Sequence, residues 1–126
     1  MSFFHDKKPI FLQIKEKIED QIFKDQIKEH EKIPSTTQMV QFYKVNHITV
    51  SKGINLLVDE GIIYKRRGVG MFVAKGAKEK LVQHRKDLFA DTFVLPMLQE
   101  AEKLSLTDED IYDIIQKLRG HKEDGI

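Results

Sequence analysis

The sequence lacks cysteine and any long run of apolar residues, and each absence excludes a class of protein. Without cysteine the chain forms no disulfide and has no thiolate for metal binding or catalysis, which suits a reducing compartment. A membrane-spanning helix needs about 18 consecutive apolar residues, and no such run exists. The first residues also lack the apolar core and the cleavage site of a secretory signal. We therefore expect a cytoplasmic protein without a membrane partner.

The sequence also lacks a recognisable site for catalysis or for a metal. The five histidines show no metal-ligand spacing with carboxylates, such as HExxH. Gly68-Val69-Gly70 fits a hairpin turn better than a glycine-rich phosphate loop. Acidic pairs such as Asp59 and Glu60 fit the charged surface of a helix. The sequence therefore predicts neither an enzyme nor a bound metal or cofactor.

The chain is long enough for one domain, or for one domain with a small appendage, and 40% of its 126 residues are hydrophobic. Its net charge of +1 hides an asymmetry. Residues 1–75 carry 13 basic against 9 acidic residues, a net of +4, whereas residues 76–126 carry 8 against 11, a net of −3. The first part is the better candidate to meet a polyanion, although many solvated surfaces show as large a difference.

Two amphipathic helices are predicted in the first third of the chain. Apolar residues spaced by four predict a helix over about residues 10–26, and Pro9 is tolerated at its start. Ser35 is a candidate N-cap for a short helix over residues 36–44. The apolar faces consist of Ile10, Ile14, Ile18 and Ile22 in the first helix and of Met39, Val40 and Tyr43 in the second. Each helix thus has one face to contribute to a core.

A third helix is predicted over about residues 47–60, after a short turn. Asn46 is its candidate N-cap, and Gly61 ends it. Gly53 costs this helix about 0.5–1 kcal/mol relative to alanine. Because Gly53 falls on the apolar face, we expect another helix to approach closely at this position.

Two short β-rich runs follow, at residues 62–65 and 71–73, and a glycine-bearing turn joins them. This pattern predicts a β-hairpin. A β-hairpin directly after two helices joined by a tight turn is the order of elements in a winged helix-turn-helix. The order is specific for the fold and less specific for a function.

The remaining residues predict a helical segment. A long helix is expected after the hairpin, and Pro96 must kink or interrupt it. Thr107 and Asp110 fit a capping box that begins a last amphipathic helix. The expected inner face of this helix consists of Ile111, Ile114, Ile115 and Leu118. We expect residues 120–126 to be frayed.

The chain resembles the DNA-binding domain of GntR-type transcriptional regulators over about residues 9–76. The resemblance lies in three segments that occur in order: PIFLQIKEKI, KIPSTTQMV and VNHITVSKGINLLVDEGIIYKRRGVGMFVAKG. The remainder is too short for the effector domains of most such regulators and resembles the two-helix dimerisation tail of the YtrA-type subfamily. YtrA-type regulators often repress operons for ABC transporters.

The resemblance implies a mainly α fold with a small β-hairpin. Its parts are a winged helix-turn-helix DNA-binding domain at residues 9–76, a helical dimerisation segment at 77–119 and a frayed tail at 120–126. It further implies a sequence-specific transcriptional regulator, most simply a repressor that binds double-stranded operator DNA as a homodimer. Because a two-fold dimer presents two recognition helices, the operator is expected to be an inverted repeat.

The resemblance, carried over position by position, also implies a set of DNA-binding residues. Thr37 stands where most family members have arginine, and His47 stands where many have arginine or, in the YtrA-type subfamily, proline. Ile48 replaces the usual threonine or asparagine. Thr49 agrees with the family, and Ser51 agrees with the YtrA-type pattern. The complete set is Ser35, Thr37, Asn46, His47, Ile48, Thr49, Ser51, Lys52, Arg66, Arg67, Gly68 and Gly70.

A helix wheel of the third helix predicts which of its side chains face DNA. At 100° per residue, His47, Ile48, Ser51, Lys52 and Asn55 lie opposite Val50, Ile54 and Leu57. In a helix-turn-helix the exposed side enters the major groove, with the helix N-terminus nearest the bases. Lys52 and the helix N-terminus can neutralise phosphate, whereas Ile48 has only a thymine methyl to contact.

These positions also have interpretations that involve no DNA binding. A single exposed isoleucine on a protein surface usually has no function. Arg66 and Arg67 fit a solvated hairpin turn as well as a contact to phosphate or to the minor groove. For the whole chain, the alternative is a winged-helix protein-interaction module with little DNA affinity, which would lack the steep salt dependence of phosphate contacts.

The apolar residues of the last segment have too little partner surface within one chain, so we expect a second copy to cover them. The predicted dimer interface consists of Leu81, Leu88, Phe89, Phe93, Leu98, Ile111 and Ile115. Whether a small-molecule effector exists stays open. A pocket of several hundred Å³ is hard to build from two helices, unless it forms between protomers.

Overall fold

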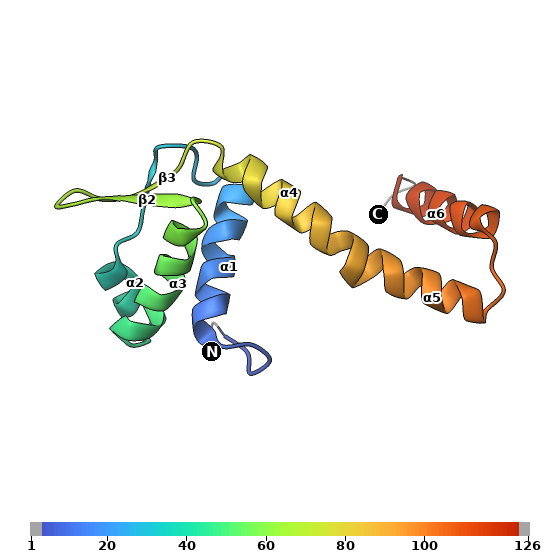
Figure 1. Ribbon diagram of the computed structural model, residues 1–126, viewed down its shortest axis with the longest axis horizontal. Helices are drawn as coiled ribbons and strands as arrows, with labels where there is room; N and C mark the ends of the chain where they lie inside the picture. The colour runs from blue at the N-terminus through green and yellow to red at the C-terminus, as the bar shows by residue number, and fades with distance from the viewer. Residues whose placement is uncertain (1–3, 124–126) are drawn as a thin grey trace. The chain divides into compact units, whose positions relative to one another are not determined.

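The computed structural model describes residues 4–123 and the side chains of residues 4–120 (Figure 1). The described chain is mainly α-helical with a small antiparallel sheet, so the predicted fold class is confirmed. The chain divides into two compact units, and the boundary lies between His84 and Arg85. The first unit contains the helix-turn-helix and the sheet, and the second contains helices only.

Helix α1 (Ile10–Phe23) begins after Pro9 and buries one apolar face, as the four-residue spacing predicts. The buried isoleucines are Ile14, Ile18 and Ile22. The helix ends before the expected residue 26. Asp25 has a left-handed backbone with a φ of 61°, and this conformation cannot continue a right-handed helix.

Helix α2 (Thr36–Tyr43) begins with the predicted cap at Ser35. The Ser35 hydroxyl accepts a hydrogen bond from the Gln38 backbone N–H at 3.0 Å, and the Gln38 side-chain oxygen accepts one from the Ser35 N–H at 2.8 Å. The two bonds form a complete capping box. The helix buries Met39 and ends at Lys44, whose left-handed φ of 57° turns the chain toward the next helix.

Helix α3 (His47–Asp59) is the predicted third helix. The Asn46 side-chain oxygen accepts a hydrogen bond from the Thr49 backbone N–H at 2.8 Å, which confirms the N-cap. Gly61 follows the helix with a φ of 74°, a left-handed conformation that glycine adopts without a steric penalty.

The close approach expected at Gly53 is also present. A Cβ atom at this position would lie 2.6 Å from the carbonyl oxygen of Phe11, so α1 passes directly against α3. The apolar side chains of α3 on either side of this contact, Val50, Ile54 and Leu57, are completely or almost completely buried. Glycine at residue 53 therefore sets the distance between the two helices.

The sheet has three antiparallel strands in the order β1-β3-β2. Strands β2 (Ile63–Arg66) and β3 (Gly70–Val73) form the predicted hairpin, and Arg66 pairs with Gly70 at its last rung. Strand β1 (Lys32–Ile33) pairs with the other edge of β3 and was not predicted from the sequence. Two residues are too few to show the alternation by which a strand is recognised.

An ion-pair cluster joins α1 to the end of α3. The Lys15 ammonium lies 3.0 Å from a Glu19 carboxylate oxygen and 3.1 Å from a Glu60 carboxylate oxygen. Burial alone would lower the pKa of Lys15, but the hydrogen bonds and negative charges of the two carboxylates outweigh it and raise the pKa. The cluster keeps the half-buried Lys15 charged and links α1 to the end of α3.

Helix α4 (Ala77–Phe89) starts in the first unit, where Ala77 and Leu81 enter the core. The assignment of Leu81 to a dimer interface was therefore wrong, because its side chain is only 3% exposed within its own chain. The same packing extends the first compact unit to His84, beyond the expected domain end at residue 76.

The second unit continues with η1 (Ala90–Val94), α5 (Leu95–Lys103) and α6 (Asp108–Glu123). Pro96 lies in the first turn of α5, where a missing N–H is tolerated, and the π-helical turn η1 comes directly before it. The wider turn is the interruption that Pro96 was expected to cause.

Helix α6 begins with the predicted capping box. The Thr107 hydroxyl accepts from the Asp110 N–H at 3.1 Å, and the Asp110 carboxylate accepts from the Thr107 N–H at 2.9 Å. The helical backbone continues to Glu123, so part of the tail expected to fray is helical. Residues 124–126 of that tail lie outside the described residues.

Candidate nucleic-acid interface

The exposed side of α3 carries the side chains that the helix wheel predicted. His47, Ile48, Lys52 and Asn55 are exposed, and Thr49 and Ser51 are half-buried. Ile48 is the most unusual of them, because 78% of this apolar side chain is exposed to solvent. The opposite side of the helix is buried against α1 and α2, so the exposed side is the one that can meet a partner.

Hydrogen bonds organise the first turn of α3. The Asn46 side-chain oxygen is occupied by the N-cap hydrogen bond, so the first role of this side chain is to fix the start of α3. The Ser51 hydroxyl lies 3.3 Å from Nδ1 of His47, one turn earlier on the same side. This contact orients the imidazole along the helix and leaves Nε2 as its outer polar atom.

The Lys52 ammonium lies 4.1 Å from the centre of the Phe11 ring, a cation–π contact between α3 and α1. The charge therefore sits at the border of the two helices and not at the centre of the exposed side of α3. From this position it adds positive potential to one flank of the surface.

The turn between β2 and β3 is the tip of the wing. The backbone N–H of Val69 donates to the Arg66 carbonyl at 2.9 Å, and Gly68 has a left-handed φ of 75°. Arg66 and Arg67 are exposed beside this turn. Gly70 has a φ of 147°, a backbone conformation that L side chains rarely adopt, so glycine is favoured at this position beside the Lys32 side chain.

A shallow pocket of about 380 Å³ lies between the wing and the beginning of α2. Its lining includes Lys32, Ser35, Thr36, Lys65, Arg66, Arg67, Gly68 and Gly70. Four cationic side chains therefore surround a helix N-terminus, whose N–H groups and dipole also favour an anion. The predicted residues Ser35, Arg66, Arg67, Gly68 and Gly70 are brought together here.

The other predicted residues lie outside this pocket, on α2 and α3. Thr37 is exposed in the first turn of α2, and the remaining residues lie on or directly before α3. One hydrogen bond links α3 with the wing, because Lys65 donates to the Asn55 side-chain oxygen at 2.9 Å. The exposed side of α3 and the basic wing thus belong to one connected structure.

Lys32 and Lys65 are candidate contacts that were not predicted from the sequence. Lys32 lies on β1, where it is exposed and its neighbour Ile33 is buried. This alternation is recognisable only after the pairing of β1 in the sheet is known. Lys65 precedes the predicted Arg66 and Arg67, and the uninterrupted basic run Lys65-Arg66-Arg67 was a signal for including it.

The predicted dimer residues of the second unit are mostly exposed within one chain. Leu88, Phe89, Phe93, Leu98 and Ile115 all present apolar surface, and Phe93 is 65% exposed. Ile111 instead is almost completely buried within its own chain, as is Ala101. The exposed apolar residues also include Met97, Leu104, Tyr112, Ile114 and Leu118, so only Ile111 of the expected inner face of α6 is buried.

Among the described residues, no group of three or more histidines and acidic side chains is arranged to hold a metal ion. No helix in the described part of the chain is both long and apolar enough to cross a membrane.

The sequence and the fold both match known regulators. The family model for bacterial regulatory proteins of the gntR family matches residues 11–73. The chain is 31% identical over 83 residues to the HTH-type transcriptional repressor YtrA of Bacillus subtilis (strain 168), and this alignment covers 66% of the chain and 64% of YtrA. The chain aligns with 92% of the length of another regulator from that organism. It aligns with only 31% and 28% of the lengths of two curated repressors.

Two solved structures extend the comparison. A putative transcriptional regulator of the GntR family from Bacteroides thetaiotaomicron has a TM-score of 0.76 and 31% identity, over 90% of this chain and 98% of that chain. The DNA-binding domain of AraR in complex with operator ORX1 has a TM-score of 0.55 and 32% identity, over 59% of this chain and 95% of that chain. These names agree with the expectation of a regulator and not an enzyme.

Proposed function

Because the chain belongs to the GntR family of bacterial regulatory proteins, we propose that it is a repressor that binds an inverted-repeat operator as a homodimer. A DNA-binding regulator is the function that the family and the similarity to YtrA and AraR support. The observation that carries the proposal is the joining of the exposed side of α3 to a basic wing. Its site of action is operator DNA in the cytoplasm.

The geometry of α3 suits the major groove, which accommodates one α-helix. His47 and Ile48 occupy its first turn, at the end that approaches base edges in a helix-turn-helix. His47 supplies a hydrogen-bonding group and Ile48 an apolar contact for a thymine methyl. Thr49 and Ser51 add hydroxyl groups at the margin of the same surface.

The wing and α2 supply the contacts that position the protein on the DNA backbone. Arg66 and Arg67 are exposed at the wing tip, and Lys32 lies beside them. The N-terminus of α2 faces the same pocket, where Ser35 and Thr36 begin the helix. The cationic side chains and the N-terminus of α2 both suit phosphate oxygens, because each phosphate is an anion. The positions of the phosphates do not depend on base sequence.

Homodimerisation is proposed through the second unit. Leu88, Phe89 and Phe93 expose a large apolar surface near the end of α4 and in η1, and the Phe89 and Phe93 rings are 5.7 Å apart. Leu98 on α5 and Ile115 on α6 expose further apolar surface. Exposed apolar surface of this kind is typical of an interaction site, and a second copy is a partner with the same surface to cover.

The similarity to YtrA and the resemblance to its subfamily favour an operon for an ABC transporter as the regulated target. Sequencing of DNA fragments enriched by the purified protein tests this directly. We expect an inverted repeat upstream of such an operon, and binding whose affinity falls steeply as salt increases. Binding without salt dependence, or no enrichment of any DNA, would favour a protein-interaction module instead.

A further inference from the structure

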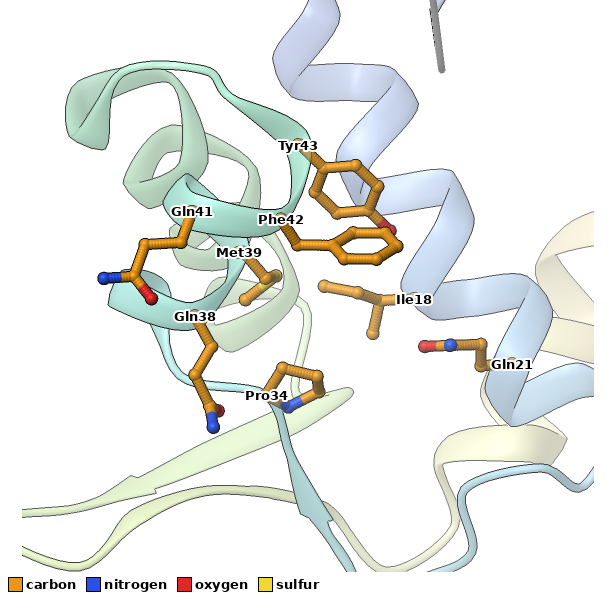
Figure 2. A pocket seen from close by; sticks show the side chains of 8 residues that line it. All are labelled: Ile18, Gln21, Pro34, Gln38, Met39, Gln41, Phe42 and Tyr43. Atoms are coloured by element: carbon orange, nitrogen blue, oxygen red, sulfur yellow. The ribbon is translucent and has the colours of Figure 1, made fainter. Parts of the chain in front are cut away.

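A pocket of about 620 Å³ lies between α1 and α2 in the first unit, away from the wing pocket described above (Figure 2). Its lining consists of Ile18, Gln21, Pro34, Gln38, Met39, Gln41, Phe42 and Tyr43. The volume lies within the range of about 300–1,000 Å³ that small-molecule sites occupy. A single winged helix-turn-helix unit therefore provides ligand-sized space, which the sequence suggested only between protomers.

The lining residues define the chemical class of a ligand. None of the eight is charged, and burial raises the pKa of the Tyr43 phenol, so that group stays neutral. Ile18 and Met39 are buried, whereas Phe42 is 62% exposed, and its ring packs edge-on against the Tyr43 ring, with 5.0 Å between the ring centres. Exposed aromatic surface beside a thioether favours another aromatic ring.

Carboxamides on both helices add hydrogen-bonding capacity at the margins of the pocket. Figure 2 shows Gln38 and Gln41 on the α2 side and Gln21 on the α1 side. The Gln38 oxygen accepts from the Ser35 N–H, but in the described part of the chain its NH₂ group donates to no protein acceptor. A ligand with an acceptor at its edge would satisfy this donor.

We propose that this pocket binds an uncharged, planar aromatic molecule with hydrogen-bonding atoms at its edge. We also propose that binding of this molecule weakens the contact of α2 with DNA. Gln38 is the connection, because it lines the pocket and also closes the capping box with Ser35. A ligand that draws the Gln38 carboxamide toward itself releases the Ser35 N–H. The N-terminus of α2, which borders the basic wing pocket, then loses part of its fixed orientation.

Binding is tested on the full chain without DNA, using quinoxaline and isoquinolin-1(2H)-one as uncharged aromatic probes and benzoate as a charged one. Nuclear magnetic resonance of the glutamine side-chain amides reports on the pocket directly. We expect saturable shifts of the Gln21, Gln38 and Gln41 amides with the uncharged probes and none with benzoate. No saturable shift at millimolar probe would overturn the proposal.

Matched variants then locate the site. Phe42→Ala should weaken probe binding by about tenfold, and Gln41→Ala, at another exposed position, should also weaken it. Val69→Ala truncates an exposed apolar side chain on the wing and should leave probe binding unchanged. Equal probe affinity in all three variants would overturn the proposal. So would amide shifts that follow protein concentration without a probe, because a second copy would then be covering the pocket.

The effect on DNA rests on the proposed function and is measured separately. Probe at a concentration that just saturates the wild type should lower its operator affinity several-fold, and the same concentration should lower that of Phe42→Ala clearly less. Probe binding without any change in operator affinity would overturn the coupling through Gln38. Absence of operator binding in the probe-free wild type would instead contradict the proposed function and leave the binding result standing.

Discussion

Ile48 presents an apolar side chain where a polar one would be expected on an exposed helix. Its neighbours on this side, His47 and Lys52, both make contacts within the chain, to Ser51 and to the Phe11 ring. Ile48 is 78% exposed at the end of α3 that approaches base edges in this motif. Exposure of this side chain to water gains nothing for the free protein, so we infer that its role lies in the complex with DNA.

Replacing Ile48 by asparagine should change the preferred base at one position in each half-site. The change removes an apolar contact to a thymine methyl, so the loss at that position should be about 1 kcal/mol, the low end for a base contact. Binding-site selection with wild type and variant measures this. An unchanged preferred sequence in Ile48→Asn would make Ile48 an incidental surface residue, and specificity would then rest on His47, Thr49 and Ser51.

Arg66 and Arg67 should differ from Ile48 in their effect, because phosphates carry no base information. Alanine at either position should weaken binding to operator and to random DNA alike and should flatten the salt slope by about one unit per lost contact. Lys117→Ala removes the same charge from α6 in the second unit and is the matched control. Equal slopes in the arginine variants and in this control would mean that the wing tip is solvated and not bound to phosphate.

At the scale of elements, most of the first unit was predictable because its signals are local. Ser35 and Asn46 mark helix starts that their side-chain hydrogen bonds confirm, and Gly61 marks a helix end. Strand β1 was missed because its pairing with β3 is non-local and its two residues show no period. The role of Leu81 was also missed, since its spacing fits an interface as well as the core that it enters.

Gly53 allows the most direct test of how closely α1 and α3 pack. Alanine at this position places a Cβ 2.6 Å from a backbone oxygen of α1, so the helices must separate. We expect Gly53→Ala to destabilise the fold by about 1–3 kcal/mol, the usual cost of overpacking, despite the higher helix propensity of alanine.

Gly120→Ala is the matched control, because a Cβ at this helical glycine meets no atom within 4 Å. It should stabilise the protein by up to about 1 kcal/mol through helix propensity alone. Thermal and urea denaturation measure both variants. If Gly53→Ala were as stable as Gly120→Ala, the close contact between α1 and α3 would not limit the fold.

At the scale of the whole molecule, a single copy leaves the second unit with little core of its own. In the described part of this unit only Ala101 and Ile111 are buried, while many large apolar side chains stay exposed. The sequence predicted this excess of apolar surface from composition and periodicity. It could not separate the residues that face a partner from those, such as Ile111, that are buried within one chain.

The proposed dimer is tested by Phe89→Asp, which places a charge within the exposed apolar surface near the end of α4. The variant should shift the protein toward a monomer in light scattering and should weaken operator binding. Val69→Asp, the same kind of change at an exposed wing residue, should keep the mass of the dimer. A dimer mass for both variants would remove these residues from the interface.

The central claim is that two copies of α3, related by two-fold symmetry, bind one operator. Hydroxyl-radical footprinting of the selected operator at stoichiometric protein tests it most directly. We predict two protected half-sites in inverted orientation, about one helical turn apart or slightly more. Protection of a single asymmetric half-site under these conditions would contradict the account.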